Sequence, residues 1–360
     1  MIKNIILFIP SIERGGVEKN LFLISNHLDL INRNIFLITA NSDYKKRFNK
    51  KIRVICPKSN IWVKKSRIIK TLISAYLLFV YFFNKKSIIL SFQSNVIAIF
   101  LSKILNFKII VRLNTSLEKY IKNNFSKVLY KFFYSLADRI VVNSYFFKKE
   151  IKKKLNLDSI LIYNSQEKKK KKKKLIFFKN FKGLKILNIG RLTDQKDQIT
   201  LLKSLKILLK KKVYFKCCII GEGEKRKELL DYIDNNNLRS SVKLIGYKKN
   251  AEIYLDFSDL FILTSKFEGL PNVLIESQSK NIPIISSNCP TGPREILLNG
   301  TLGDLFDVGN YKKLSELIIN FRKNKKRLVR KSKKAKNYLI RFNIKSNSKK
   351  YEKIIRSLDL

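Results

Sequence analysis

Two glutamates, Glu268 and Glu276, stand eight residues apart with a Gly-Leu-Pro turn between them. The apolar run 260–263 comes just before, and an apolar-periodic segment starts near Pro271, which suits a helix start because proline has no amide hydrogen to leave unpaired. Glu268 should therefore lie on a loop at the carboxyl end of a buried strand. Glu276 should lie about one turn into the next helix, where it can face the same crevice.

The start of that helix is a candidate anion site. Amides in the first turn of a helix have no partner within it, and with the helix dipole they attract a phosphate. Here they belong to Asn272, Val273 and Leu274, which follow the turn at Gly269. One carboxylate before such a site and one just inside it fits a nucleotide sugar, whose sugar hydroxyls and ribose hydroxyls flank the diphosphate.

The string Phe-Glu-Gly-Leu-Pro-Asn-Val-Leu-Ile-Glu at 267–276 resembles the Glu-x7-Glu motif of the retaining glycosyltransferases of family 4. The resemblance implies the GT-B fold, an α/β architecture in which two Rossmann-like, doubly wound parallel-sheet domains face a central cleft. It also implies that Glu268 orients the donor sugar and that Glu276 takes the ribose hydroxyls.

A second strand, loop and helix carry a pair of cations. The apolar run 184–189 leads to Gly190, Arg191 and Lys196, and a helical pattern follows at 197–210. The fork of an arginine and the point charge of a lysine together suit a diphosphate. The segment resembles the family's Gly-Arg-Leu-x3-Lys signature, which implies that Arg191 and Lys196 bind the nucleotide diphosphate and stabilise it as it leaves.

Four further turns resemble parts of the family's donor side. The loop with Gly15 and Gly16 follows the first apolar run and would line the cleft beside the donor phosphates and the acceptor. The Gly-Glu-Gly-Glu turn at 221–224 looks like the family's glycine turn but lacks the third glycine of a dinucleotide fingerprint, so we expect it to be structural. Backbone near Tyr247 would face the nucleotide base, and a Gly-x-x-Glu turn ending at Glu295 would abut the donor sugar.

Alternating apolar runs and helical patterns predict a parallel, doubly wound sheet in each half of the chain. In the first half the expected strands are 4–9, 35–39, 54–55, 88–91, 108–112 and 140–143, and in the second half they are 184–189, 215–220, 242–244, 260–263 and 282–286. The expected helices between the first set are 17–30, 69–83, 94–105, 126–137 and 144–155. Ser94, Asn114 and Thr115 follow strands of the first half and are candidates for the acceptor side, although many family members carry a histidine near Asn114 and Thr115.

Seven consecutive lysines at 168–174 repel one another and predict a solvated linker. We therefore expect an acceptor-binding Rossmann-like domain over 1–167 and a lysine-rich linker over 168–182. A nucleotide-sugar-binding Rossmann-like domain should follow over 183–337. The resemblance implies that the last helix, within 338–360, crosses back to the first domain.

The formal net charge of the 360 residues is +49, carried mostly by lysine. Nucleic-acid binding favours arginine, and no RNA- or DNA-binding motif is present, so we expect no nucleic-acid partner. The excess of lysine reflects either codon bias or attraction to an anionic membrane surface. The longest uncharged run, 71–84, is too short to span a bilayer and predicts either a buried helix or an interfacial one with Tyr76, Tyr81 and Phe82 at the headgroups.

The chain offers little for metal or histidine chemistry. It has four cysteines without metal-ligand spacing and one histidine, His27, in an amphipathic helix pattern. No signal peptide is evident, because the run 5–9 is short and ends at Pro10. We expect a cytoplasmic protein, peripheral at the inner face of the cytoplasmic membrane, that needs no metal or other cofactor.

The sequence thus predicts a retaining, metal-independent glycosyltransferase. It would move a hexose or N-acetylhexosamine from a nucleotide-diphosphate sugar, UDP-linked, to a lipid-linked, polysaccharide or lipopolysaccharide acceptor. The resemblance implies a front-face reaction in which the leaving phosphate helps to deprotonate the acceptor, and no second carboxylate is evident as a nucleophile. Two alternatives remain open, namely a non-catalytic nucleotide- or anionic-lipid-binding module on the same scaffold and a GT-B sugar-nucleotide epimerase.

Overall fold

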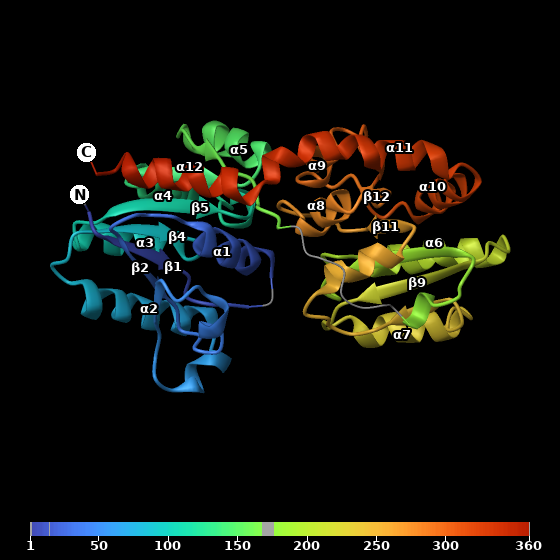
Figure 1. Ribbon diagram of the computed structural model, residues 1–360, viewed down its shortest axis with the longest axis horizontal. Helices are drawn as coiled ribbons and strands as arrows, with labels where there is room; N and C mark the ends of the chain where they lie inside the picture. Colours follow the sequence, from blue (N-terminus) through green and yellow to red (C-terminus); the bar gives the residue numbers. More distant parts are fainter. Residues whose placement is uncertain (1, 14, 168–175, 360) are drawn as a thin grey trace. The chain divides into compact units, whose positions relative to one another are not determined.

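The computed structural model describes residues 2–13, 15–167 and 176–359. The chain forms two compact units, here called unit 1 (Met1–Glu167 with Arg341–Leu360) and unit 2 (Lys168–Ile340). Figure 1 shows the elements of both. The lysine run of the predicted linker lies outside the described residues. Residues 176–182, also assigned to the linker, belong to unit 2, where Phe178 and Phe181 are buried.

Unit 1 is built on a parallel sheet of seven strands in the order β3-β2-β1-β4-β5-β6-β7. The strands are β1 (Asn4–Phe8), β2 (Asn34–Ile38), β3 (Ile52–Ile55), β4 (Ser87–Ser91), β5 (Lys108–Leu113), β6 (Arg139–Val142) and β7 (Ile160–Leu161). Its α-helices are α1 (Gly16–His27), α2 (Arg67–Phe82), α3 (Asn95–Ile104), α4 (Asn124–Ser135), α5 (Tyr145–Leu155) and α12 (Ile344–Arg356).

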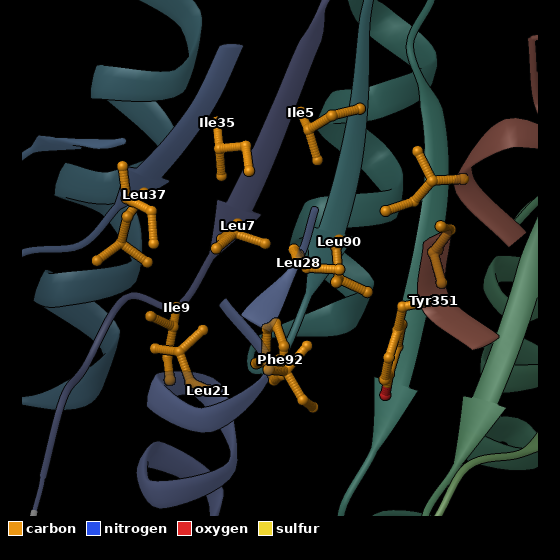
Figure 2. Close-up of a cluster of buried hydrophobic side chains, with 14 of the residues drawn as sticks. Ile5, Leu7, Ile9, Leu21, Leu28, Ile35, Leu37, Leu90, Phe92 and Tyr351 are labelled. Atoms are coloured by element: carbon orange, nitrogen blue, oxygen red, sulfur yellow. The ribbon is translucent and has the colours of Figure 1, made fainter. Parts of the chain in front are cut away.

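The two faces of this sheet are covered by different helices. Ile5 and Leu7 of β1 point into a core shared with α1 and α12, whose Tyr351 is fully buried there (Figure 2). Ile6 and Phe8, which alternate with them, point into a second core shared with α2, α3, α4 and α5. A strand buried on both faces reads as a continuous apolar run, which is why the sequence revealed it. The chain's last helix therefore completes the first unit.

Unit 2 contains a parallel sheet of six strands in the order β10-β9-β8-β11-β12-β13. The strands are β8 (Leu184–Ile189), β9 (Phe215–Ile220), β10 (Val242–Leu244), β11 (Leu260–Leu263), β12 (Ile284–Ser287) and β13 (Asp304–Phe306). Its α-helices are α6 (Gln198–Lys210), α7 (Arg226–Asn235), α8 (Asn272–Ser279), α9 (Pro293–Ile296), α10 (Tyr311–Lys323) and α11 (Lys325–Ala335). The first four of these strands begin and end where the sequence predicted, whereas β12 begins after Pro283.

In each sheet the winding reverses between two neighbouring strands. The reversal lies between β1 and β4 in unit 1 and between β8 and β11 in unit 2. Loops that leave two such strands diverge to opposite faces and open a crevice at the carboxyl ends, where ligands of doubly wound sheets bind. The β8/β11 reversal therefore defines where a ligand site of unit 2 is expected.

The helix of the uncharged run, α2, is buried on one side only. Leu78 and Phe82 pack into the core, but Leu72 and Tyr76 are exposed. The expectation of a buried helix is therefore wrong for half of its surface. Within the described residues, no helix is both long and apolar enough to cross a membrane.

Candidate functional site

The β8–α6 loop and the β11–α8 loop place Lys196 and Glu268 in contact. The Lys196 Nζ lies 2.5 Å from the Glu268 Oε1, and the two side chains are 16% and 6% exposed. Both residues were predicted to act on the donor, each from its own motif. The structure joins them because β8 and β11 are neighbours in the sheet.

Hydroxyl groups fix this pair from several sides. Ser265 Oγ donates a 2.6 Å hydrogen bond to the same Oε1 of Glu268, and Thr291 Oγ1 donates to the Glu268 backbone carbonyl. Thr264 Oγ1 donates to the Lys196 carbonyl at 2.9 Å. A carboxylate held by an ammonium and a hydroxyl is stabilised as an anion and oriented before a ligand arrives.

Arg191 lies on the same loop as Lys196 but is exposed to solvent. The guanidinium is exposed, and its hydrogen bond to Gln195 Oε1 is long, at 3.4 Å. Gln195 in turn donates to the Phe267 carbonyl at 3.0 Å, and its own carbonyl accepts from the Lys266 amide at 2.8 Å. These bonds tie the two loops together and leave Arg191 accessible to an anion from solvent.

Helix α8 begins at Asn272, directly after Pro271, and buries Asn272 and Glu276. The Leu274 amide donates to the Pro271 carbonyl at 3.1 Å. The prediction of three ligand-facing amides is therefore wrong for Leu274, because its N–H closes the first turn of the helix. The Leu274 amide is thus not available to a phosphate.

Gly292 allows the β12–α9 loop to pack against the Gly-Leu-Pro turn. Its φ is +57°, and a Cβ at this position would lie 2.2 Å from the Gly269 carbonyl oxygen. Only glycine fits such a contact and such a backbone angle. The close approach sets Thr291 beneath Glu268.

The glycines of the 221–224 turn have the structural role that we expected. A Cβ on Gly221 would lie 1.8 Å from the Gly190 carbonyl oxygen, and a Cβ on Gly223 would lie 2.2 Å from the Leu192 carbonyl oxygen. The turn after β9 thus supports the β8–α6 loop from below. Any side chain at Gly221 or Gly223 would displace the β8–α6 loop.

The other predicted donor residues are less closely tied to the pair. Tyr247 is exposed in the segment after β10, two strands away from β8. Glu295 is half-buried within the short helix α9. Their predicted contacts with a donor stay predictions.

In unit 1, the predicted loop residues lie at the carboxyl ends of the strands. Gly15 and Gly16 stand at the start of α1, and Thr115 is exposed after β5. Ser94 precedes α3 with a left-handed φ of +54°, and its Oγ lies 2.9 Å from the Thr71 Oγ1. The predicted role of Gly15 and Gly16 beside the donor phosphates stays a prediction, as does that of Ser94 and Thr115 beside an acceptor.

Both polar atoms of the Asn114 side-chain amide form hydrogen bonds within the protein. Its Oδ1 accepts from the Arg112 Nε at 3.0 Å, and its Nδ2 donates to the Phe92 carbonyl at 3.1 Å. The buried Arg112 also donates to Asn164 and to Tyr351 of α12. Asn114 thus positions a buried cation rather than pointing freely toward an acceptor.

Sequence reasoning missed a buried acid beside Gly15. Glu18 is 4% exposed, and Gln93 Nε2 donates to its Oε1 at 3.3 Å. A Cβ on Gly15 would lie 2.6 Å from the Glu18 Oε2, so the carboxyl group folds back over the glycine. Burial raises the pKa of the Glu18 carboxyl group. The available signal was an acid in the first helical turn after two glycines.

The thiol beside Glu268 is not a candidate nucleophile. Burial, with a smaller contribution from the Glu268 charge, raises the pKa of Cys289 to about 12, so the group stays a thiol at neutral pH. In the parts of the chain that the structure describes, no group of three His, Cys, Asp or Glu side chains could hold a metal ion. The expectation that transfer needs no metal stays a prediction.

Comparison with protein families finds a match over residues 164–338, to the family Glycosyl transferases group 1. The matched range includes both loops that hold Lys196 and Glu268. The resemblance seen in the sequence is thus supported for this part of the chain. Membership of family 4 and the function of the Glu-x7-Glu motif stay predictions.

Two relatives illustrate the similarity to known proteins. The chain is 37% identical over 200 residues to an uncharacterized glycosyltransferase of Methanocaldococcus jannaschii, across 51% of this chain and 48% of the relative. It is 30% identical over 198 residues, or 53% of each chain, to the N-acetylgalactosamine-N,N'-diacetylbacillosaminyl-diphospho-undecaprenol 4-alpha-N-acetylgalactosaminyltransferase of Campylobacter jejuni. The chain therefore spans about half the length of these relatives.

Among solved structures, the chain is similar to Anabaena Alr3699/HepE, which was solved in complex with UDP-glucose. The TM-score is 0.79 over 98% of this chain and 99% of that one, at 18% sequence identity. An identity this low shows the fold alone. The predicted fold class, α/β with two Rossmann-like parallel-sheet domains of the GT-B type, is confirmed.

Proposed function

We propose that this chain is a retaining glycosyltransferase that moves a hexose or N-acetylhexosamine from a UDP-linked sugar to a lipid-linked or polysaccharide acceptor. The observation that carries the proposal is the Lys196–Glu268 pair at the β8/β11 reversal, beside Arg191. The match to Glycosyl transferases group 1 over the same residues supports the reaction class. The UDP-glucose of HepE and the diphospho-undecaprenol in the name of the Campylobacter relative support the donor and the acceptor.

Sugar transfer from a nucleotide diphosphate demands that growing charge on the leaving group be stabilised. Arg191 and Lys196 supply two cations on one loop, and the start of α8 adds amide donors. Groups fixed in advance act without reorganisation, and removal of one typically costs about 10²–10³ in rate. Leaving-group stabilisation is therefore the main task that we assign to unit 2.

Lys196 and Glu268 divide the work between phosphate and sugar. An ammonium has three donors, so Lys196 can hold the Glu268 carboxylate and a phosphate oxygen together. Glu268 then accepts hydrogen bonds from hydroxyl groups of the donor sugar and so sets the orientation of the anomeric carbon. Glu276, buried on the first turns of α8, is assigned to the ribose hydroxyls.

The surroundings of Glu268 argue for positioning rather than for nucleophilic attack. Its Oε1 accepts hydrogen bonds from both Lys196 and Ser265. A carboxylate oxygen held by two donors would have to give up these hydrogen bonds before it could attack the anomeric carbon. We therefore propose retention through a front-face reaction, in which the leaving phosphate takes the acceptor proton.

We place the reaction in the cytoplasm, at the inner face of the membrane. A diphospho-undecaprenol acceptor of the kind that the Campylobacter relative's name describes is anchored in a bilayer. A peripheral protein that binds that surface reaches such an acceptor without spanning the membrane. The strongly basic composition supports the same location.

The test begins with a panel of nucleotide sugars and their effect on the melting temperature, because a ligand that binds the native state stabilises it. The best donor is then incubated with a short-chain lipid-diphosphate saccharide, with and without a metal chelator. We expect UDP release and a product whose anomeric configuration, read by NMR, equals that of the donor. Nucleotide binding without UDP release would favour the non-catalytic alternative, and an isomerised free sugar nucleotide would favour the epimerase.

A further inference from the structure

Helix α2 carries an apolar stripe on its exposed side. Ile68, Leu72, Tyr76, Phe79 and Phe83 are all exposed, and Ile68 and Tyr76 reach 74% and 66%. Their spacing of four, four, three and four residues places them on one face of the helix. The opposite face, with Leu78 and Phe82, packs into the core, so α2 is apolar on both sides.

The next two helices repeat this arrangement. Helix α3 exposes apolar residues at intervals of three and four, and α4 does so at intervals of three, one and three. The exposed residues are Ile97, Phe100 and Ile104 on α3 and Phe125, Val128, Leu129 and Phe132 on α4. Each helix therefore presents a stripe of its own to solvent.

The three stripes form one surface. Helix α3 packs against both α2 and α4, and all three helices cover the same face of the unit 1 sheet. We call the twelve residues just named the apolar face. Monomeric proteins rarely leave contiguous apolar patches beyond a few hundred Å² in water, and larger patches mark binding surfaces. Among the described residues of unit 2, exposed apolar side chains such as Tyr214 and Leu230 form no such rows on neighbouring helices.

The charge around the apolar face is predominantly positive, although Arg67 pairs with Glu13 and Lys103 of α3 pairs with Asp138. The sequence from 64 to 117 contains no Asp or Glu. The exposed residues Lys64, Lys65 and Arg67 stand at the start of α2, and Lys85 and Lys86 follow its end. On α4, the exposed Lys127 and Lys131 alternate with the apolar stripe. A partner that binds this face must therefore offer an apolar region to the stripes and anionic groups to the surrounding lysines.

We infer that the apolar face docks unit 1 on an anionic lipid bilayer, with α2, α3 and α4 lying in the interface. Aromatic and aliphatic side chains enter the boundary between headgroups and acyl chains, and the lysines meet the anionic headgroups. A second copy of the chain is a poor occupant, because the two basic rims would repel each other. The inference rests on the peripheral location proposed above and names the surface that provides it, and its test needs no transfer activity.

The test is flotation of the full chain with vesicles of phosphatidylcholine, with and without phosphatidylglycerol. We expect binding to the mixed vesicles that weakens but persists at high salt, since apolar insertion is not screened. The double variant Leu72→Glu/Phe100→Glu should lower the bound fraction about tenfold or more, because both carboxylates would have to enter the interface. Ile31→Glu is the matched control: Ile31 is 71% exposed in the α1–β2 loop of unit 1, outside the apolar face.

Three results would overturn the inference. One is no flotation of the unchanged chain, and another is an equal loss in Ile31→Glu with unchanged melting temperatures. The third is a dimer in gel filtration that the double variant dissociates, which would assign the face to a second copy. Transfer to a water-soluble acceptor analogue should persist in the double variant, so a failure of docking and a failure of the proposed reaction are measured separately.

Discussion

The two winding reversals share a topology but differ in charge. At β8/β11 of unit 2, the acid Glu268 meets the ammonium of Lys196 at 2.5 Å. At β1/β4 of unit 1, the acid Glu18 meets the neutral amide of Gln93 at 3.3 Å, and burial raises its pKa. The topology of a doubly wound sheet thus fixes where a ligand binds, and the side chains fix which ligand it is.

This difference supports separate tasks for the two units. A crevice with fixed cations suits a diphosphate, which carries charge into the site and gains more charge as it leaves. A crevice with amide and hydroxyl groups suits the hydroxyls of a sugar acceptor. We therefore propose that unit 2 binds the donor and unit 1 the acceptor.

The largest expected effect comes from breaking the pair at β8/β11. Lys196→Ala should lower the transfer rate about 10²–10³-fold, because it removes a cation from the leaving group. It should also cost about 3–5 kcal/mol of stability, since Glu268, 6% exposed, keeps a buried charge without its partner. Lys196→Met/Glu268→Gln should recover much of that stability and none of the rate. Rates and urea unfolding of the single and double variants measure both.

Lys266→Ala is the matched control for these variants. Lys266 is exposed on the same loop, two residues before Glu268. Its removal should leave the transfer rate within about twofold and the stability within about 0.5 kcal/mol. A fall in rate as large as that of Lys196→Ala would mean that general positive charge, and not the pair, binds the donor.

A smaller effect is expected from filling the contact beneath Glu268. Gly292→Ala places a Cβ 2.2 Å from the Gly269 carbonyl oxygen at a φ of +57°, so we expect a loss of about 2–3 kcal/mol in unfolding free energy. Gly309→Ala is the control, because its φ is +76° and nothing lies within 4 Å of the added carbon. It should cost only the backbone strain, about 1 kcal/mol. Equal losses in urea unfolding would show that the loop contact is unimportant.

Much of unit 2 was predictable because its strands are buried on both faces and appear as apolar runs with sharp ends. The motifs also located Lys196 and Glu268 on loops after strands. The sequence could not show that these loops are neighbours, since strand order follows from packing of the whole domain. Nor could it reveal Ser265 and Thr291, because single hydroxyl residues carry no pattern of their own.

Helix α2 shows a different limit of sequence reasoning. A helix reveals its buried face when polar residues mark the other one. Between Thr71 and Phe82 the helix has apolar residues on both sides, so its sequence did not distinguish a buried face from an exposed one. Only the packing of Leu78 and Phe82 decided which side is free.

The stabilising contributions of buried acids in the two units should change with pH in opposite directions. Asp304 is the example from unit 2. Burial alone would raise its pKa, but hydrogen bonds from Arg327 and Lys331 hold the pKa below its ordinary value of 3.8. Its stabilising contribution is therefore present above that value and is lost as the pH falls through the folded-state pKa. Asp304→Asn should cost about 1–2 kcal/mol at pH 7 in urea unfolding, and progressively less as the pH is lowered below 3.8. A cost that does not depend on pH would contradict the assignment.

The smallest expected effect belongs to Glu18 of unit 1. Its pKa is raised by burial, against the lowering effect of its backbone hydrogen bonds and of Arg67, while nearby Glu13 adds to the rise. Its contribution is therefore complete below the unfolded-state value of about 4.3 and is lost as the pH rises through the folded-state pKa. Glu18→Gln keeps a hydrogen-bonding group beside Gln93 without the buried charge. We expect it to be more stable than the unchanged chain by up to about 1 kcal/mol at pH 7, with no gain at pH 4.

The same variant separates stability from acceptor binding in unit 1. If the carboxyl group of Glu18 accepts a hydrogen bond from an acceptor hydroxyl, Glu18→Gln should raise KM for the acceptor several-fold and leave KM for the donor unchanged, because the two cations that we assign to the donor diphosphate lie in unit 2. A rise in the donor KM alone would place Glu18 on the donor side and remove the division of tasks between the two reversals. An unchanged KM for both substrates, with the stability gain present, would restrict Glu18 to a structural role beside Gly15.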